Sequence, residues 1–236
     1  MHTDPRKEDF DDYSEDYDRA LAEGLSVAGE NKEYFATGRI QWLRGRLDEL
    51  RERSERVLDF GCGDGSASEL ILKYLGARET IGVDTSSRMV ALGRRRYGGD
   101  RSHFFHMNEY RPNADVDLVY SNGVFHHIAP SERPQTFDYV YRCLQAGGLF
   151  ALWENNPWNP GTRYVMSRIP FDRDAIPLTP RESRVSVQAA GFEIVHTDFL
   201  FLFPHVLRFL RWLEPLVSRY PLGAQYLVLC RKPFKV

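Results

Sequence analysis

Residues 56–66 read Arg-Val-Leu-Asp-Phe-Gly-Cys-Gly-Asp-Gly-Ser, and much of the chain's organisation follows from them. An apolar run typical of a buried strand leads into three alternating glycines, and a helix-compatible segment follows over residues 66–75. Because glycine has no Cβ, such a turn can adopt positive φ and bring backbone N–H groups against a ligand. Strand, glycine-rich turn and helix predict the first βα unit of a nucleotide-binding sheet, with the ligand beyond the carboxyl end of the strand.

Two details of this turn distinguish between nucleotide ligands. Dinucleotide-binding turns follow G-x-G-x-x-G, whereas here the third glycine comes one position early and Ser66 takes the last place. Asp59 precedes the glycines, and its carboxylate would repel a pyrophosphate but suits a cationic amino group. The turn therefore disfavours an NAD-type oxidoreductase. Its D-x-G-x-G-x-G pattern resembles the first motif of the class I S-adenosylmethionine (SAM) methyltransferases.

The next predicted strand supports a nucleoside ligand. Residues 80–84 form a short apolar run that ends in Asp84, 25 positions after Asp59. A carboxylate at the tip of this strand can accept hydrogen bonds from both ribose hydroxyls. Asp84 is also placed to cap a helix beginning near Ser86, and the two roles are compatible. Residues 85–89, which end in Met89, resemble the family segment in which an apolar side chain packs on the adenine.

The resemblance extends through three further strands, predicted at residues 102–107, 116–120 and 149–154. A helix over 132–144 ends before Gly147 and Gly148, which read as a C-terminal helix signal. Asn108 stands where the family usually has an aspartate near the adenine amino group. The resemblance implies that SAM is the cofactor, S-adenosylhomocysteine the product, and that the cofactor-binding residues are Tyr17, Arg39, Asp59, Gly61, Cys62, Gly63, Gly65, Asp84, Thr85, Met89, Asn108, Glu109, Ser121 and Asn122.

Length and composition predict a single domain over residues 1–236. We expect an N-terminal helical lid over 1–50, a SAM-binding core over 51–154, and a substrate-side insertion with the last strands over 155–236. The net charge of −2 disfavours a nucleic-acid partner. Three isolated cysteines suit a reducing cytoplasm and lack metal-ligand spacing. We find no run of apolar residues long enough for a membrane span.

The predicted fold is α/β: a Rossmann-like, seven-stranded, mostly parallel sheet with helices on both faces. Ala190-Gly191-Phe192 resembles the family's entry to the sixth strand, which runs towards residue 203. Residues 225–230 read as strand seven, antiparallel and inserted between strands five and six. Between them, residues 205–216 predict an apolar helix, packed in the core or at a homodimer seam. Its arginines beside Trp and Phe leave peripheral membrane contact through residues 199–220 as the alternative.

Two regions outside the common core are expected to select the acceptor. Tyr13, Tyr17 and Leu21 recur at helical spacing in the N-terminal segment, and a second helix is expected around residues 34–47. After the fifth strand, two prolines and a glycine predict a rigid turn at the mouth of the site. Its Asn-Pro-Trp run is not the amino-methylating signature, which belongs at the end of strand four. The candidate substrate-binding residues are Tyr13, Tyr34, Asn155, Trp158, Arg163 and Tyr164.

The expected reaction is methyl transfer to a small molecule, with a hydroxyl favoured over nitrogen or carbon. The acceptor classes considered are a natural product, a glycoside and a lipid-linked sugar. A hydroxyl benefits from a general base, and His126, His127 and Glu154 are the candidates. Metal-dependent transfer is disfavoured, because Ser121-Asn122 offers no carboxylate to a hard cation. The alternative is a SAM-binding protein that transfers no methyl group, acting as a different enzyme or as a partner subunit.

Overall fold

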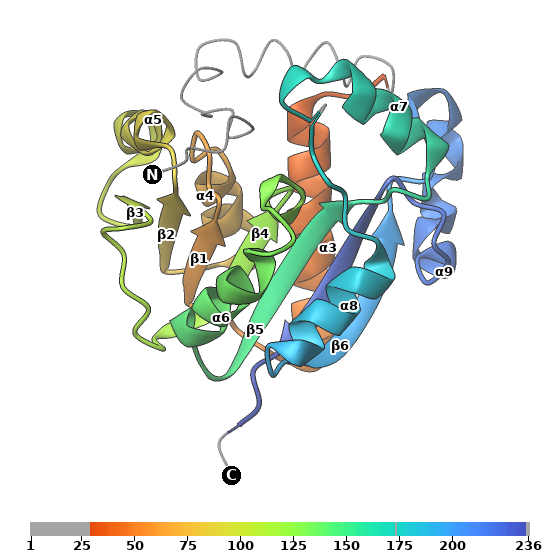
Figure 1. Ribbon diagram of the computed structural model, residues 1–236. Helices are drawn as coiled ribbons and strands as arrows, with labels where there is room; N and C mark the ends of the chain where they lie inside the picture. The colour runs from red at the N-terminus through yellow and green to blue at the C-terminus, as the bar shows by residue number, and fades with distance from the viewer. Residues whose placement is uncertain (1–28, 173, 235–236) are drawn as a thin grey trace.

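The structure, a computed structural model, describes residues 29–172 and 174–234. A seven-stranded sheet forms its middle layer (Figure 1). The strands are β1 (Arg56–Phe60), β2 (Glu79–Asp84), β3 (Ser102–His106), β4 (Val116–Asn122), β5 (Leu144–Asn155), β6 (Glu193–Leu200) and β7 (Gln225–Arg231). The helical elements are α3 (Lys32–Leu50), α4 (Ala67–Leu70), η2 (Ile71–Leu75), α5 (Ser87–Tyr97), η3 (Phe125–His127), α6 (Arg133–Cys143), α7 (Pro160–Arg168), η4 (Pro170–Asp172), α8 (Pro180–Ala189), η5 (His205–Leu213) and α9 (Glu214–Val217).

The strand order is β3-β2-β1-β4-β5-β7-β6. Strands β1 to β5 pair in parallel, whereas β7 is antiparallel to both of its neighbours. The inner strands are buried on both faces, as parallel sheets covered by helices require. The predicted sheet, with its inserted antiparallel strand, is confirmed.

Helices cover the sheet on both faces and give it two hydrophobic cores. In front of the sheet in Figure 1, α6 and α8 contribute Phe137, Val140 and Val187 to one core. Behind it, α3 contributes Ile40 and Leu43 to the other. This layering leaves the carboxyl ends of β1, β2, β4 and β5 at one edge, where the preceding analysis places the ligand.

Several element boundaries differ from those expected. The predicted helix over 66–75 consists of the short α4 followed by a π-helical turn, η2. β4 continues through Asn122, and β5 already begins at Leu144, where it pairs with Val116. The reading of Gly147 and Gly148 as a helix end is therefore wrong, because both lie inside β5. Gly147 has a φ of 81° there, and a Cβ would collide with the Phe234 ring.

The segment after β6 departs most from expectation. Residues 205–213 form a kinked 3₁₀ helix, and the α-helix α9 follows it. Neither element has a buried residue, so the expected core packing of 205–216 is wrong.

At the N-terminal end, α3 spans the whole of the second helix expected around residues 34–47 and extends beyond it at both ends. Its Phe35, Ile40, Leu43 and Leu47 pack on the sheet. Tyr13, Tyr17 and most of the expected lid lie outside the described residues.

Candidate active site

A cavity of about 960 Å³ opens at the carboxyl ends of the central strands. Its lining comes from the turns after β1, β2 and β4, from the start of α3, and from α7, η4 and residues 201–204. The volume lies within the range typical of small-molecule sites. The cavity therefore has one wall at the glycine-rich turn and another in the region between β5 and β7.

The glycine-rich turn after β1 supplies the first wall. Gly63 has a φ of 52° and lines the cavity, and a Cβ added there would meet no atom of the described residues within 4 Å. Gly65 serves packing instead, because its Cβ would lie 2.6 Å from the Phe104 ring of β3 and 3.1 Å from Gly93 Cα of α5. Gly61 lines the cavity beside Val124. The open backbone at Gly63 is the kind of surface that a ligand can approach closely.

Asp84 is placed for the predicted ribose contact. Its two carboxylate oxygens accept hydrogen bonds from the backbone N–H groups of Gly63 and Ser86, each at 2.8 Å, and the residue lines the cavity. Burial raises its pKa, and the backbone hydrogen bonds oppose that rise. Ser86, rather than Asp84, caps α5 by accepting from the Met89 N–H. The carboxylate is thus fixed in position at the cavity wall.

The residues present at this wall fit SAM. Asp84 offers acceptors for ribose hydroxyls, Gly63 leaves room against its backbone, and Met89 and Met107 supply apolar surface for the adenine. Thr85, Asn122 and Arg39 also line the cavity. Arg39 donates to Tyr120 Oη at 3.2 Å and to Gln225 Oε1 at 2.9 Å.

Other predicted cofactor residues do not reach the cavity lining. Asp59 is buried behind it, and burial together with the neighbouring Asp84 and Asp64 raises its pKa to about 7. Cys62 packs on Val90 and Phe104, and Ser121 is fully buried. In the turn after β3, Glu109 forms an ion pair with Arg94 at 3.1 Å, with the exposed Asn108 beside it. Tyr17 lies outside the described residues.

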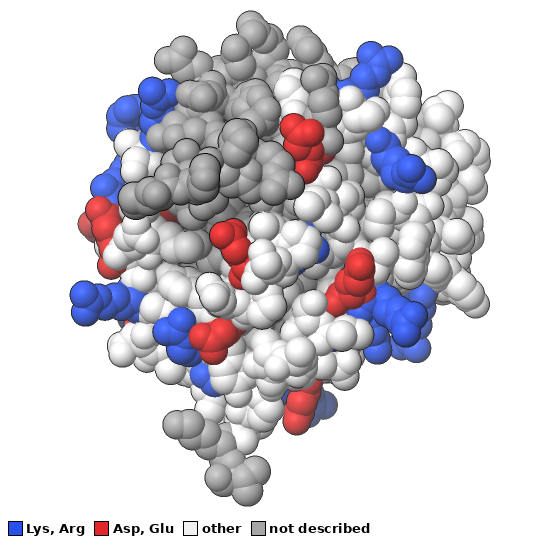
Figure 2. All heavy atoms as spheres, viewed as in Figure 1, with Lys and Arg blue, Asp and Glu red and all other residues white. Residues whose placement is uncertain are grey.

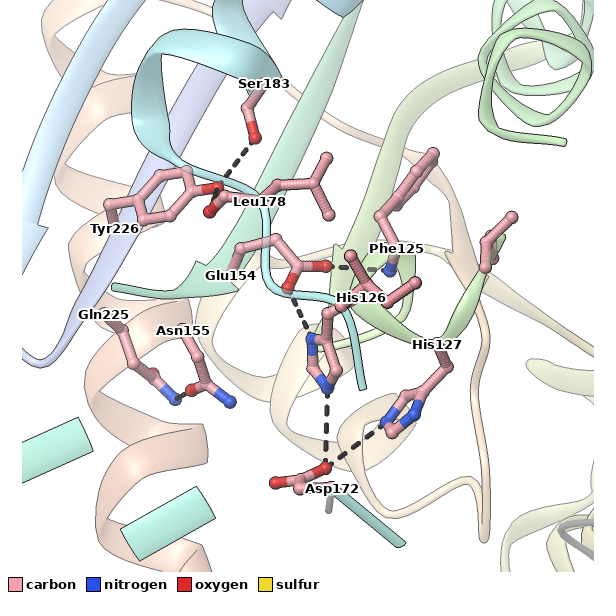
Figure 3. Close-up of polar contacts among 12 residues, drawn as sticks. Phe125, His126, His127, Glu154, Asn155, Asp172, Leu178, Ser183, Gln225 and Tyr226 are labelled. Atoms are coloured by element: carbon pink, nitrogen blue, oxygen red, sulfur yellow. Dashed lines mark hydrogen bonds and ion pairs between the residues drawn. The ribbon is translucent and has the colours of Figure 1, made fainter. Parts of the chain in front are cut away.

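A buried cluster of histidines and carboxylates forms the floor of the cavity between η3 and η4 (Figure 3). His126 Nδ1 lies 2.6 Å from Glu154 Oε2, and Glu154 Oε1 accepts from the Phe125 N–H at 2.8 Å. His126 Nε2 lies 3.5 Å from Asp172 Oδ1, and His127 Nε2 lies 3.4 Å from the same oxygen. The three candidate bases therefore belong to one network, completed by Asp172.

The network gives its two histidines different protonation states. Burial disfavours charge on His126, but Glu154 and Asp172 outweigh it and raise its pKa to about 10. Burial and the charge of His126 together lower the pKa of His127. Burial opposes charge on Asp172 as well, yet the hydrogen bonds from both histidines lower its pKa to about 2. At neutral pH His126 is an imidazolium, whereas His127 is neutral.

His126, His127 and Asp172 also offer ligand atoms within 4.8 Å of one another, a separation that a metal ion could bridge. His126 has no lone pair to offer while it is protonated between two carboxylates. Metal independence stays a prediction, which a chelator tests directly.

The opposite wall of the cavity is mostly apolar. It comes from two segments that are distant in sequence, and its side chains are Val165, Met166, Ile169, Phe171, Phe201, Leu202 and Phe203. Of the predicted substrate residues, Tyr34 and Asn155 line the cavity. Trp158, Arg163 and Tyr164 are exposed and do not line it. Tyr13 lies outside the described residues.

The sequence analysis missed Asp172 and this apolar wall. Asp172 is held by the 3₁₀ turn η4, which lies within the predicted substrate-side insertion but was given no role there. An acid between two prolines in a loop after β5 was the available signal. It indicates a rigid loop but not the histidines that it meets.

Each lysine or arginine side chain in the described lining is already paired with a protein group. Lys32 lies 2.9 Å from Asp64, and Arg211 lies 2.7 Å from Glu30. Arg39 is held by Gln225. The same lining contains the acids Glu30, Asp84, Glu132, Asp172 and Asp174. This balance suits a ligand without strong negative charge.

Comparisons with known proteins show what this chain is similar to. Residues 57–148 match a family model described as a methyltransferase domain. A trans-aconitate 2-methyltransferase of an Acidovorax species is 25% identical over 172 residues, which are 67% of this chain and 66% of that protein's length. A protein of Mycolicibacterium smegmatis described as a probable SAM-dependent methyltransferase is 29% identical over 196 residues, 79% of this chain and 72% of that protein.

Solved structures share the fold. The Haloferax volcanii protein in complex with the Trm112 methyltransferase activator aligns with a TM-score of 0.62 and 19% identity, over 98% of both chains. An identity this low supports the fold and nothing finer. The strand order, the glycine-rich turn and Asp84 agree with the methyltransferase-domain match over residues 57–148, so the chain has the fold and the SAM-type cofactor wall of the class I SAM-dependent methyltransferases.

Proposed function

We propose that this methyltransferase transfers the methyl group of SAM to a hydroxyl of a neutral, largely apolar small molecule. The observation that carries the proposal is the pairing of a neutral histidine with an apolar wall across one cavity. His127 provides a base for a hydroxyl proton. Phe171, Phe201 and Phe203 provide apolar surface for the rest of the acceptor.

SAM supplies a methyl group already activated by its sulfonium charge, so the protein's contribution is position and proton transfer. In the proposed reaction the acceptor oxygen would form a bond to the methyl carbon as the carbon–sulfur bond of SAM breaks, which leaves S-adenosylhomocysteine, and the hydroxyl proton would pass to His127. Asp172, 3.4 Å from His127, stabilises the positive charge that His127 gains. His126 is already protonated and acts as a positioning residue, because its contacts with Glu154 and Asp172 fix the η3 turn.

Trans-aconitate, named for the Acidovorax relative, is a poor fit to this cavity. A tricarboxylate needs several cations that are available to it. The three lysine and arginine side chains in the described lining pair with Asp64, Gln225 and Glu30. We therefore favour acceptors such as a natural product, a glycoside or a lipid-linked sugar. The cytoplasm is the proposed compartment, because the chain's three cysteines are unpaired thiols.

The test is an acceptor screen with methyl-labelled SAM. The panel contains phenols, alkyl glycosides and lipid-linked sugars, with trans-aconitate as the anionic competitor. We expect labelled ether product from a neutral amphiphile, and loss of that product in His127→Ala. Preferential esterification of trans-aconitate would contradict the proposed acceptor class. SAM binding with no transfer to any acceptor would favour a protein that binds the cofactor for another purpose.

A further inference from the structure

The elements η5 and α9 leave large apolar side chains exposed to solvent. Val206 is 77% exposed, Phe209 68%, Trp212 71% and Leu216 72%. Soluble proteins rarely expose so many large apolar side chains close together unless the surface binds something. This surface therefore requires a partner or a lipid phase to cover it.

The exposed surface continues onto neighbouring segments. Tyr220 and Leu222 follow α9 and are also exposed. Asn159 donates from Nδ2 to the Leu222 carbonyl at 2.7 Å, which brings the turn carrying exposed Trp158 to the same place. We call the set Trp158, Val206, Phe209, Trp212, Leu216, Tyr220 and Leu222 the apolar face.

Polar contacts on the inner side hold the apolar face in position. Arg211 donates to Glu30 at 2.7 Å and to the Phe203 carbonyl at 3.2 Å, and its guanidinium lies 4.5 Å from the centre of the Tyr34 ring. Glu214 accepts from the Phe203 N–H at 3.2 Å. Two half-buried side chains of η5 and α9, Arg211 and Glu214, are thus hydrogen-bonded on the inner side, while Val206, Phe209, Trp212 and Leu216 face outward.

Charge around the apolar face is positive. Residues 199–224 contain three arginines and one acid. That acid, Glu214, accepts a hydrogen bond from the backbone N–H of Phe203. Arg208 and Arg219 are exposed beside the face. On the right of Figure 2, where η5 and α9 lie in Figure 1, the surface is mostly white with blue groups at its border. Arginines beside Trp, Phe and Leu are typical of helices that lie at a membrane surface.

The apolar face also adjoins the entrance of the site. Phe203, Pro204 and Arg211 belong to the same segment and line the cavity. The turn that carries Trp158 leads directly into α7, whose Thr162, Val165 and Met166 line it from the other side. An apolar acceptor leaving a lipid layer at this face would therefore meet the apolar wall first.

We propose that the apolar face docks this protein onto a membrane surface that carries anionic lipid headgroups. The protein would lie on the bilayer rather than cross it, since no helix in the described ranges is long and apolar enough to cross. The docking rests on the face alone. That the acceptor comes from the lipid layer rests, in addition, on the proposed function.

The test is flotation of the full-length protein with vesicles. One set is phosphatidylcholine alone, and the other mixes phosphatidylcholine and phosphatidylglycerol in equal parts. We expect binding to the anionic set, weakened about tenfold or more in F209S/W212S, which removes two exposed aromatic groups. Arg208→Gln and Arg219→Gln should each weaken binding to the anionic vesicles about fivefold. Added salt should weaken this binding as well.

Val185→Ser is the matched control, because Val185 is 59% exposed on α8 and outside the apolar face. Control and variants should keep the thermal midpoint and SAM affinity of the unaltered protein. Absence of flotation with anionic vesicles, or equal flotation by F209S/W212S, would overturn the proposal. So would a dimer in sedimentation that F209S/W212S converts to monomer without vesicle binding, since the face would then join two copies. Flotation requires no methyl transfer, so its result stands apart from the acceptor screen.

Discussion

The two walls of the cavity are built in different ways. The cofactor wall uses backbone groups and an acid at the ends of adjacent parallel strands, so Gly63 meets Asp84 wherever β1 and β2 pair. The acceptor wall joins η3, the end of β5, α7, η4 and the irregular segment at 201–203, which no strand pairing brings together. Sheet topology therefore specifies the first wall, whereas the second depends on the path of the segments between β5 and β7. This difference indicates that cofactor binding and acceptor chemistry can be separated by substitution.

His127→Ala should produce the largest difference between the effect on turnover and the effect on SAM binding. Loss of a general base typically lowers turnover by about a hundredfold to ten-thousandfold. SAM affinity should stay unchanged, because the contacts that fix Asp84 do not involve His127. Single-turnover rates and calorimetric titration with SAM measure the two effects. An unchanged rate would reduce His127 to a structural residue.

His126→Ala should mainly lower the free energy of unfolding. Removing one partner of a buried ion pair leaves Glu154 uncompensated and costs about 3–5 kcal/mol. The folded-state pKa of His126, about 10, exceeds its ordinary value of 6.5, so its stabilisation is complete below 6.5 and is lost as pH rises towards 10. The stability of the unaltered protein should fall over that range, and that of the variant should fall less.

Urea titrations at several pH values measure this dependence. The double variant His126→Leu/Glu154→Leu is the control, because it removes both charges and should recover part of the lost stability. Equal dependence on pH in the unaltered protein and in His126→Ala would show that this network does not hold the histidine protonated.

Asp84→Ala should affect the cofactor wall alone. Loss of a carboxylate that binds two hydroxyls should weaken SAM binding by about a hundredfold or more, because each hydrogen bond to a charged group contributes about 1.5–3 kcal/mol. Asp84→Asn is the matched variant, since it keeps the size and one acceptor oxygen and should lose less. Unaltered SAM affinity in Asp84→Ala would refute the ribose assignment.

The same contrast explains what the sequence could reveal. The strands, their order and the inserted antiparallel β7 were predictable, because apolar runs and glycine-rich turns are local signals that a parallel sheet assembles in only a few ways. Gly147 and Gly148 were misleading because two glycines after a helical segment usually mark the end of the helix. Here β5 has already begun at Leu144, which pairs with Val116 of β4, so both glycines lie inside the strand. The exposure of 205–217 was also hidden, because an apolar helix reads alike whether it is buried or faces a lipid surface.

Within the site, residues at the ends of strands were easier to locate from the sequence than contacts between distant loops. Asp84 and Gly63 are recognisable from their places after strands, and the structure brings them together at 2.8 Å. His126, His127 and Glu154 were candidate bases, but their division of labour follows from Asp172, which the sequence did not connect with them. Burial and two carboxylates give the adjacent histidines different protonation states. No local sequence pattern indicates which histidine is protonated.

The smallest expected effect is that of a chelator. If His126, His127 and Asp172 form a proton network, EDTA should leave turnover and thermal midpoint unchanged, because an imidazolium between two carboxylates donates from both ring nitrogens and cannot ligate. Added Zn²⁺ should then inhibit, by competing for the base His127. Loss of activity in EDTA that Zn²⁺ or Fe²⁺ restores would mean that the cluster binds a metal, with Glu154 orienting His126 as a ligand. In that case the metal ion would activate the hydroxyl of the methyl acceptor. The acceptor wall would then differ from the cofactor wall in its chemistry as well as in its construction.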